Sequence, residues 1–284
     1  MKKIICAVFV IVTTSSFAQE LVEYKVIKDE PTEPKNSLNL EFMNMDVNAA
    51  YFDNLSFNLG VNGYSKITDN LYVTYALNKS YLVLGRLLDK TFPGNLEINS
   101  GVQFFFKENT FKRTVNVVLD SKEETHGSTR YTTTTSIPVP ATIKKKLGFE
   151  GGANFRRCAF EFEDSEFVLS HTGIGLYSGI VSRKITNVII YDERYGKSFK
   201  SVGADVFFDV LIMPVNTFKQ VSSGVKETHK ALPFGFRCGY KLFQVEKKEF
   251  TGKNFGISGT ASVGYRPYQG WNVTAGVGFT ILKR

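Results

Sequence analysis

The sequence predicts an all-β protein, a transmembrane antiparallel up-and-down β-barrel of about twelve strands, with ten as the alternative. Three observations predict it. Apolar and polar residues alternate along many segments, which is the period of a strand. Several segments exceed the ~5–6 residues of an ordinary strand and reach the ~9–11 residues that a tilted strand needs to cross a bilayer. The polar face of these segments also carries few charges.

The chain begins with the features of a signal peptide. Lys2 and Lys3 form a basic start, an apolar stretch follows, and Ser16 and Ala18 supply the small residues that precede a cleavage point. The apolar stretch is shorter than the ~20 residues of a membrane-spanning helix. We therefore expect a signal peptide at 1–18, a periplasmic N-terminal tail at 19–36 and the barrel at 37–284.

The composition excludes several classes of protein. Removing residues 1–18 takes away two lysines, so the net charge changes from +8 to +8 − 2 = +6, and no basic stripe or finger spacing indicates nucleic acid. Three scattered histidines and the lack of a Cys/His cluster predict no metal and no cofactor. Cys158 and Cys238 could form a disulfide in an exported chain. The apolar strand face around Cys238 favours a small hydrophobe instead.

The strands follow from the alternation. They are expected near 38–50, 55–65, 70–78, 95–106, 111–120, 146–156, 168–182, 199–213, 232–246, 254–266 and 271–281. A barrel in lipid must close, and bacterial barrels have even strand numbers, so a further strand at 186–192 gives twelve. This arrangement places short periplasmic connections at 66–70 and 107–110, and long outer connections at 79–94, 121–145 and 214–231.

The polar face decides which side of the barrel meets lipid. In the segments 254–266 and 271–281 this face consists mainly of Gly, Ser, Thr and Asn, whereas Lys and Glu collect in the connections. A face in bulk water would carry those charges, so small uncharged residues indicate a confined aqueous lumen and apolar faces turned to lipid. Aromatic residues near strand ends are expected to form interfacial girdles: Tyr64, Tyr81, Tyr177, Tyr265, Tyr268 and Trp271.

Four charged residues are candidates for a lumen charge ladder. If paired residue numbers in 199–213 and 232–246 sum to 446, Asp209 faces Arg237 and Asp205 faces Lys241 on the polar face. Directly opposed charges stabilise a sheet by ~0.2–1 kcal/mol. Two interpretations stay open, a structural ladder that fixes the register and a cluster that controls selectivity or gating.

No catalytic constellation is evident. His171 is expected to point into the lumen, while its neighbours Ser170 and Thr172 point the other way. Asp205 and Asp209 lie four residues apart on one strand, about 13 Å, which is too far for a catalytic dyad. We expect no enzyme activity, and an outer-membrane hydrolase is the least supported alternative.

Two further segments suggest surface contacts. Lys144, Lys145 and Lys146 at the expected outer rim could bind the phosphates of outer-leaflet glycolipid, or could simply end a solvated loop. Residues 21–27 of the tail are dense enough in β-formers to add a strand to a partner, although a disordered leader is the alternative.

The last strand resembles the C-terminal recognition signal of bacterial outer-membrane barrels. Thr274, Gly276, Phe279 and Ile281 stand at the positions of its polar residue, glycine and two bulky apolar residues. The chain departs from the pattern by continuing through residues 282–284. Together with "GYSKITDNLYV" and "SFAQE", the sequence resembles the outer-membrane β-barrel proteins of Bacteroidota-type bacteria. This resemblance implies insertion by the barrel-assembly machinery and implies no activity.

The expected function is therefore that of an integral outer-membrane β-barrel. We expect a non-enzymatic structural or accessory subunit of an envelope assembly of the secretion or gliding type, in contact with outer-membrane lipid and an envelope protein. A narrow channel for small or apolar solutes is one alternative, and a surface adhesin that uses residues 121–145 is another.

Overall fold

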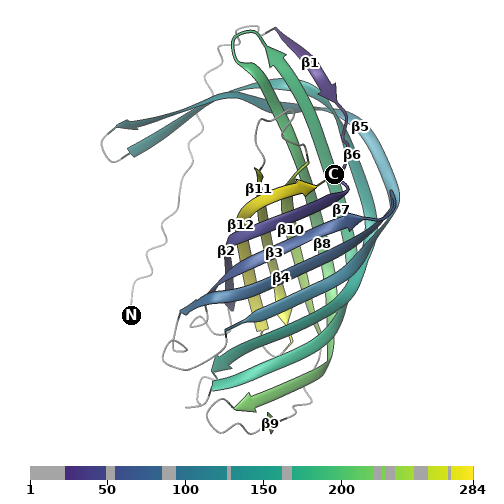
Figure 1. Cartoon of the computed structure of the whole chain (residues 1–284), viewed down its shortest axis with the longest axis vertical. Helices are drawn as coiled ribbons and strands as arrows, with labels where there is room; N and C mark the ends of the chain where they lie inside the picture. The colour runs from purple at the N-terminus through teal and green to yellow at the C-terminus, as the bar shows by residue number, and fades with distance from the viewer. Residues whose placement is uncertain are drawn as a thin grey trace.

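The computed structural model describes residues 23–48, 55–84, 94–126, 129–161, 168–220, 226–227, 234–245, 255–267 and 270–283. These residues form one antiparallel sheet that curls into a barrel (Figure 1). None of them belongs to a helix that is long and apolar enough to span a membrane. The expected signal peptide at 1–18 lies outside the described residues.

Ten of the described strands close a ring. They are β2 (Asn36–Asn48), β3 (Leu55–Lys66), β4 (Leu71–Leu84), β5 (Leu96–His126), β6 (Thr129–Glu161), β7 (Val168–Asp192), β8 (Gly196–Gln220), β10 (Phe234–Gln244), β11 (Phe255–Arg266) and β12 (Gly270–Lys283). Each pairs with its sequence neighbour in the ring, and the pairing of β12 with β2 closes it. Two short strands lie beside the ring: β1 (Tyr24–Asp29) pairs with β7, and β9 (Lys226–Glu227) pairs with β8.

The all-β barrel is confirmed, and the ring has the strand number of the ten-strand alternative. The predicted strands at 111–120 and 186–192 are the far halves of β5 and β7. The prediction of a connection at 107–110 is wrong, because β5 continues through it. The charges that suggested a turn are paired across the ladder, where Lys144 Nζ of β6 lies 3.0 Å from Glu108 Oε1.

The two ends of the barrel differ. We call the end that carries Asn36, the turn 67–70 and Lys283 the termini end. The hairpins β5–β6 and β7–β8 continue beyond the wall at this end, at the top of Figure 1. The prediction that residues 121–145 form a loop at the opposite, outer end is therefore wrong. The predicted turn at 107–110 would have reversed the chain and carried these residues to that end, but β5 continues through 107–110 without a turn.

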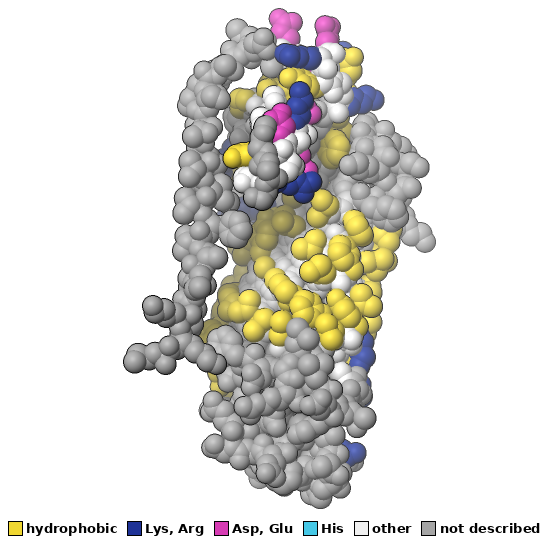
Figure 2. Space-filling view, turned by 90° about the vertical axis from the view of Figure 1, so that its left-hand side faces the viewer, with side chains coloured by type: hydrophobic (Ala, Val, Ile, Leu, Met, Phe, Trp, Pro, Cys, Tyr) yellow, Lys and Arg dark blue, Asp and Glu magenta, His cyan; other side chains and the backbone are white. Residues whose placement is uncertain are grey.

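An apolar belt surrounds the outside of the wall. Figure 2 shows hydrophobic side chains gathered across the middle of the molecule, with charged side chains above them. Exposed belt residues include Phe42, Leu59, Leu77, Val102, Phe104, Phe149, Leu176, Ile180, Val206, Phe208, Val210, Ile257, Val263, Val273, Val277 and Phe279. The side chains between them on each strand point into the lumen and are mostly polar. An exposed apolar belt around a polar interior is the surface that a barrel presents to hydrocarbon.

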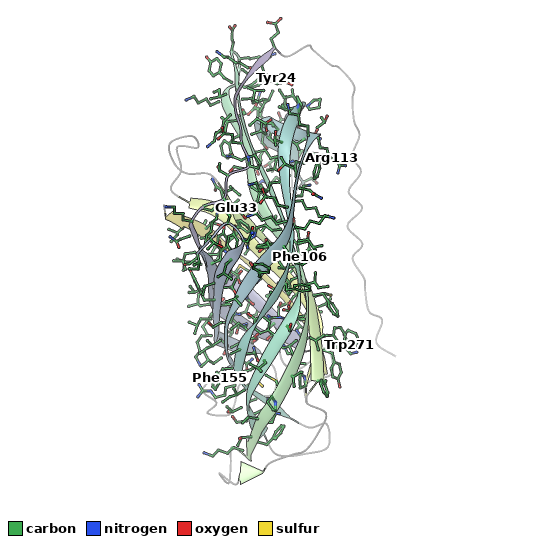
Figure 3. The ribbon with its side chains drawn as sticks, turned by 90° about the vertical axis from the view of Figure 1, so that its right-hand side faces the viewer. Tyr24, Glu33, Phe106, Arg113, Phe155 and Trp271 are labelled. Atoms are coloured by element: carbon green, nitrogen blue, oxygen red, sulfur yellow. The ribbon has the colours of Figure 1, made fainter. Side chains whose placement is uncertain are left out.

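Beyond the belt, the two long hairpins form a small two-layer sandwich. The pairing of β6 with β7 ends at Thr186, and β1 then takes the vacated edge of β7. Val117, Val139, Ala141, Val188 and Ile190 are fully buried between the layers. We call this region the extension. Figure 3 places Tyr24 and Arg113 there, at the opposite end of the molecule from Trp271 and Phe155.

The N-terminal tail is therefore not a free leader over its described length. Tyr24 to Asp29 form a strand of the extension, and Asp29 accepts hydrogen bonds from the backbone N–H and the hydroxyl of Thr142, at 2.6 and 2.7 Å. The β-forming residues of this segment pair with the edge of β7, in the chain's own sheet.

Candidate functional site in the lumen

The four charged residues of the predicted ladder lie in the lumen with the expected register. Arg237 is paired with Asp209, and Lys241 with Asp205. The Arg237 Nε donates to Asp209 Oδ2 at 2.7 Å. Asp205 has a different partner, because Arg183 of β7 donates two hydrogen bonds of 2.8 Å to its carboxylate. Lys241 Nζ lies over the Phe207 ring, 5.0 Å from its centroid.

A larger charge network crosses the lumen beside this ladder. Arg156 donates to Glu97 at 2.7 Å and to Asp46 at 3.1 Å, and Arg266 donates to Asp46 at 2.7 Å. Arg237 joins the network through Glu97, 4.0 Å away. Three guanidinium groups and three carboxylates (with Asp209) thus neutralise one another, as buried charges require.

Sequence reasoning missed Asp46, Glu97, Arg156 and Arg266. They come from β2, β5, β6 and β11, and only the closed ring brings them together. One signal could have found them, because each is a charged residue at a lumen-facing position of an alternating strand.

Glu33, from the predicted tail, enters the lumen at the termini end. Its carboxylate accepts hydrogen bonds from Lys146 Nζ and Tyr72 Oη, both at 2.5 Å, and lies 3.5 Å from Arg183. Burial alone would raise the pKa of Glu33, but the positive charges of Arg183 and Lys146 outweigh burial and hold the pKa below its ordinary value. Figure 3 places Glu33 between the extension and the wall.

Aromatic side chains complete a plug at this end. The Arg183 guanidinium lies 4.4 to 5.5 Å from the ring centroids of Tyr64, Tyr72, Phe105 and Phe243. These four rings pack with Val181, Ile185, Phe207 and Val245 into a buried cluster. We call Glu33, Lys146, Arg183 and this cluster the plug.

Two predictions fail here. Tyr64 does not belong to an interfacial girdle, because it faces inward in the plug, and Tyr177 faces inward beneath Arg237. Lys146 does not contact glycolipid, because its side chain is 2 % exposed and pairs with Glu33. Lys144 to Lys146 also lie toward the termini end, whereas the prediction placed them at the opposite end. Tyr265 and Trp271 do lie exposed near the opposite end, whereas Tyr268 is outside the described residues.

A polar cavity of about 150 Å³ is present in the lumen. Amide side chains line much of it, and Glu41 accepts hydrogen bonds there from Asn44 at 2.6 Å and Asn62 at 2.7 Å. A Cβ atom at Gly276 would lie 2.7 Å from the Glu41 carboxylate, so glycine at this position makes room for the charge. The cavity has room for about ten ordered waters, because each needs only ~10–15 Å³ of such volume.

The four residues of the expected C-terminal signal lie on both faces of β12. Thr274 and Gly276 face the lumen, where the Thr274 hydroxyl lies 2.6 Å from that of Ser262. Phe279 faces outward and packs on Phe42, with ring centroids 5.3 Å apart, and Ile281 lies on the same outer face. Recognition by the barrel-assembly machinery stays a prediction.

Neither of the two cysteines in the described residues, Cys158 and Cys238, forms a disulfide. Cys158 is buried in the lumen, and Cys238 lies on the outer face of β10, so the wall separates them and they do not form a disulfide. Cys158 instead lies beside His171, its partner in the ladder between β6 and β7. Among the described residues, no group of His, Cys, Asp and Glu side chains could hold a metal ion.

Comparison with known proteins gives little beyond the fold. No family model and no curated protein matches the chain. Among solved structures, it is similar to a loop L8 deletion mutant of OmpT, an outer membrane protein of Vibrio cholerae, with 7% sequence identity over 87% of this chain and 99% of that chain. The TM-score is 0.17. The description of the closed ring, the apolar belt and the polar lumen does not depend on this weak similarity.

Proposed function

We propose that the chain is an integral outer-membrane barrel that acts as a non-enzymatic structural or accessory subunit of an envelope assembly, with the extension as its docking element. The observation that carries this proposal is the combination of a filled lumen with a structured extension beyond the apolar belt. The barrel anchors the chain in lipid, and the extension beyond the belt is available to protein partners.

The filled lumen argues against a constitutive channel. The charge network joins opposite walls, and the plug closes the termini end with aromatic rings and the Glu33–Lys146 ion pair. A solute would have to displace these paired charges, and an unpaired charge in such a space is costly.

The tip of the β5–β6 hairpin is the proposed docking surface. We define it as residues 120–126 and 129–135, whose strands project beyond the sandwich core (Figure 1). An isolated two-stranded ribbon is marginally stable in water, and its free edge can accept a strand from another chain. In the described part of the chain, β4 pairs with β5 only as far as Phe104, so the edge of β5 is unpaired along the tip.

The two edges of this hairpin are unequal near its base. The N–H of Thr142 points away from β5, because it donates to Asp29. N–H groups alternate in direction along a strand, so the backbone nitrogens of Pro138 and Pro140 also point away from β5. Proline has no N–H, so neither position can donate a hydrogen bond to an added strand. The edge of β6 is therefore interrupted, and we assign the docking edge to β5.

We infer the orientation of the barrel from the lengths of its turns. Bacterial outer-membrane barrels have short turns on the periplasmic side, and the four-residue turn 67–70 lies at the termini end. The extension would then be periplasmic. A surface adhesin built on residues 121–145 would need the opposite orientation, so we do not favour it.

A matched pair of proline substitutions tests the docking edge. Glu123 and Thr132 are paired and both direct their N–H groups outward, Glu123 from β5 and Thr132 from β6. In native pull-downs from mild detergent, Glu123→Pro should reduce recovery of the envelope partner, whereas Thr132→Pro should retain it. Equal retention by both variants and by a chain lacking the tip would contradict the proposal.

A conductance measurement separates the channel alternative. Purified protein in liposomes should conduct no ions, and Glu33→Ala should loosen the plug and permit some leak. Steady conductance of the unaltered barrel, with no partner recovered from native membranes, would favour the channel over the structural role.

A further inference from the structure

Three buried side chains at the other end of the lumen form an arrangement that the charge network does not use. They are Cys158 of β6, His171 of β7 and Asn216 of β8. The Cys158 Sγ lies 3.7 Å from His171 Nδ1, and His171 Nε2 lies 2.9 Å from Asn216 Oδ1. Adjacent strands place them together, since Cys158 is paired with His171 in the ladder.

The contacts of Asn216 fix the tautomer of His171. Asn216 Nδ2 donates to the carbonyl oxygen of Met213, so Oδ1 is the atom that faces the imidazole. An amide oxygen only accepts, so His171 Nε2 must carry a proton and donate it. In the neutral imidazole, Nδ1 then carries a lone pair, and the Cys158 Sγ lies 3.7 Å from this nitrogen.

The surroundings hold this geometry in place. The Phe218 ring stacks on the imidazole with centroids 4.8 Å apart. The Arg156 guanidinium lies beside the sulfur and is itself held by Glu97 and Asp46. Arg156 and His171 both line the lumen cavity and both lie beside the Cys158 thiol. Cys158 itself is buried behind the cavity lining, so a small molecule in the cavity reaches the sulfur only when these two side chains move aside.

We propose that Cys158, His171 and Asn216 form a nucleophilic thiol site that accepts an acyl group from a small activated ester or thioester in the lumen. A nucleophile, a base within hydrogen-bond reach and a third group that orients the base are the parts that nucleophilic catalysis uses. Cys158 is the nucleophile, His171 is its base and Asn216 is a positioning residue.

The reaction balances without an oxidant or a metal. The Cys158 proton passes to His171 Nδ1 as the sulfur forms a bond to the carbonyl carbon. The bond from that carbon to the leaving group breaks, and the leaving group takes the proton from His171. The product is an S-acyl cysteine, and the Arg156 charge beside the sulfur favours the negative charge that develops during attack.

The proposal is separate from the docking role and needs no partner. The test uses the full mature barrel in detergent with p-nitrophenyl acetate as the acyl donor. One equivalent of p-nitrophenolate should be released in a burst, with the acetyl group on the peptide that contains Cys158. Cys238→Ser should behave as the unaltered barrel, because Cys238 lies on the outer face, and Cys158→Ser should abolish the burst.

Three further variants distinguish proton transfer to His171 from an effect of burial alone. His171→Gln should slow acylation at neutral pH by at least about tenfold. Its rate should then fall about tenfold for each pH unit on the acidic side, because only thiolate reacts. The unaltered barrel should instead show a plateau between the pKa values of His171 and the thiol. Asn216→Asp, which keeps an acceptor, should retain that plateau, and Asn216→Leu should lose it.

The outcome is decisive because folding is checked separately, by heat-dependent migration of each barrel in electrophoresis. A folded barrel whose Cys158 reacts no faster than Cys238 overturns the proposal. So does a folded His171→Gln variant that keeps the rate and the plateau, because the three side chains would then form only a structural hydrogen-bond chain.

Discussion

The belt and the extension use the same alternation of side chains in two environments. On β6, odd-numbered residues face outward in the belt, where Phe149 is 57% exposed, and are buried in the sandwich at Val139 and Ala141. On β7, even-numbered Ile180 is 50% exposed, and Ile190 is fully buried. The alternation thus indicates that one face of the strand is shielded from water. It does not indicate whether lipid or protein covers that face.

The opposite faces of the same strands do differ. Inside the belt, charges such as Asp209, Arg156 and Arg183 are buried and paired. In the extension, Lys112 and Thr114 on this face are exposed to solvent, where charge needs no partner. The polar face, with its partners, is therefore what separates a lumen from a water-exposed surface.

The largest effect is expected from breaking one pair of the lumen. Asp209→Leu leaves Arg237, whose side chain is mostly buried, without its nearest carboxylate and should lower the free energy of unfolding by about 3–5 kcal/mol. Urea unfolding in lipid vesicles, followed by the fluorescence of Trp271, the single tryptophan of the chain, measures it.

The matched control removes both charges. Asp209→Leu with Arg237→Met should recover most of the lost stability, because neither charge is left alone. If the double variant were as unstable as the sum of the two single variants, the pair would not be coupled, and the lumen would be wet enough to solvate both charges.

A charge on the belt comes next. Ile180→Arg places a guanidinium at a lipid-facing position and should lower the free energy of unfolding by about 2–4 kcal/mol if the site lies near the bilayer midplane. The control is Ile67→Arg in the turn 67–70, an exposed position outside the wall, which should change little. Equal, small effects at both positions would mean that hydrocarbon does not cover the belt.

Much of the barrel could be predicted because lipid and closure constrain it tightly. The segments that became β3, β11 and β12 each lie within the belt, so each alternating run corresponds to one strand. The register of β8 with β10, which pairs Asp209 with Arg237, followed from placing opposite charges on one face. Local pattern and charge complementarity were sufficient there.

The extension and the larger site could not be predicted from local sequence patterns. The charges of Lys107 and Glu108 suggest a turn, because in the membrane-spanning part of the chain charges collect between strands. Outside lipid, however, a strand can carry charges and continue, as β5 does. The network of Asp46, Glu97 and Arg156 depends on ring closure between distant strands. Glu33 belonged to a polar segment with no periodicity, and only its buried partners Lys146 and Arg183 place it.

A smaller and local effect should distinguish the sandwich from the belt. Ile190→Val removes one methylene group from the extension core and should cost about 0.5–1.5 kcal/mol there. Amide hydrogen exchange should become faster in β1 and in residues 186–192, while the urea midpoint of the barrel stays unchanged. A shift of that midpoint would show that the extension and the wall unfold as one unit. Thr133→Ala at the exposed tip should change neither measurement.

The smallest effect concerns pH and the tail. Because the pKa of Glu33 is lowered in the folded chain, its ion pairs are fully present above the ordinary range of a glutamate, about pH 4.3, and are lost as pH falls through the lowered value. The groups that face Glu33 are Lys146, Arg183 and Tyr72. Exchange protection of β1, corrected for intrinsic rates, should thus be constant from neutral pH to about pH 5 and fall only in stronger acid.

Glu33→Gln is the control for this pH dependence. Its amide keeps the size of the side chain but lacks the charge, so protection of β1 should be lower at neutral pH and should show no further fall in acid that depends on this residue. If the unaltered chain lost protection between neutral pH and pH 5 while Glu33→Gln did not, Glu33 would titrate above its ordinary value. Burial would then outweigh the charges of Lys146 and Arg183, and the tail would be held by the pairing of β1 with β7 alone.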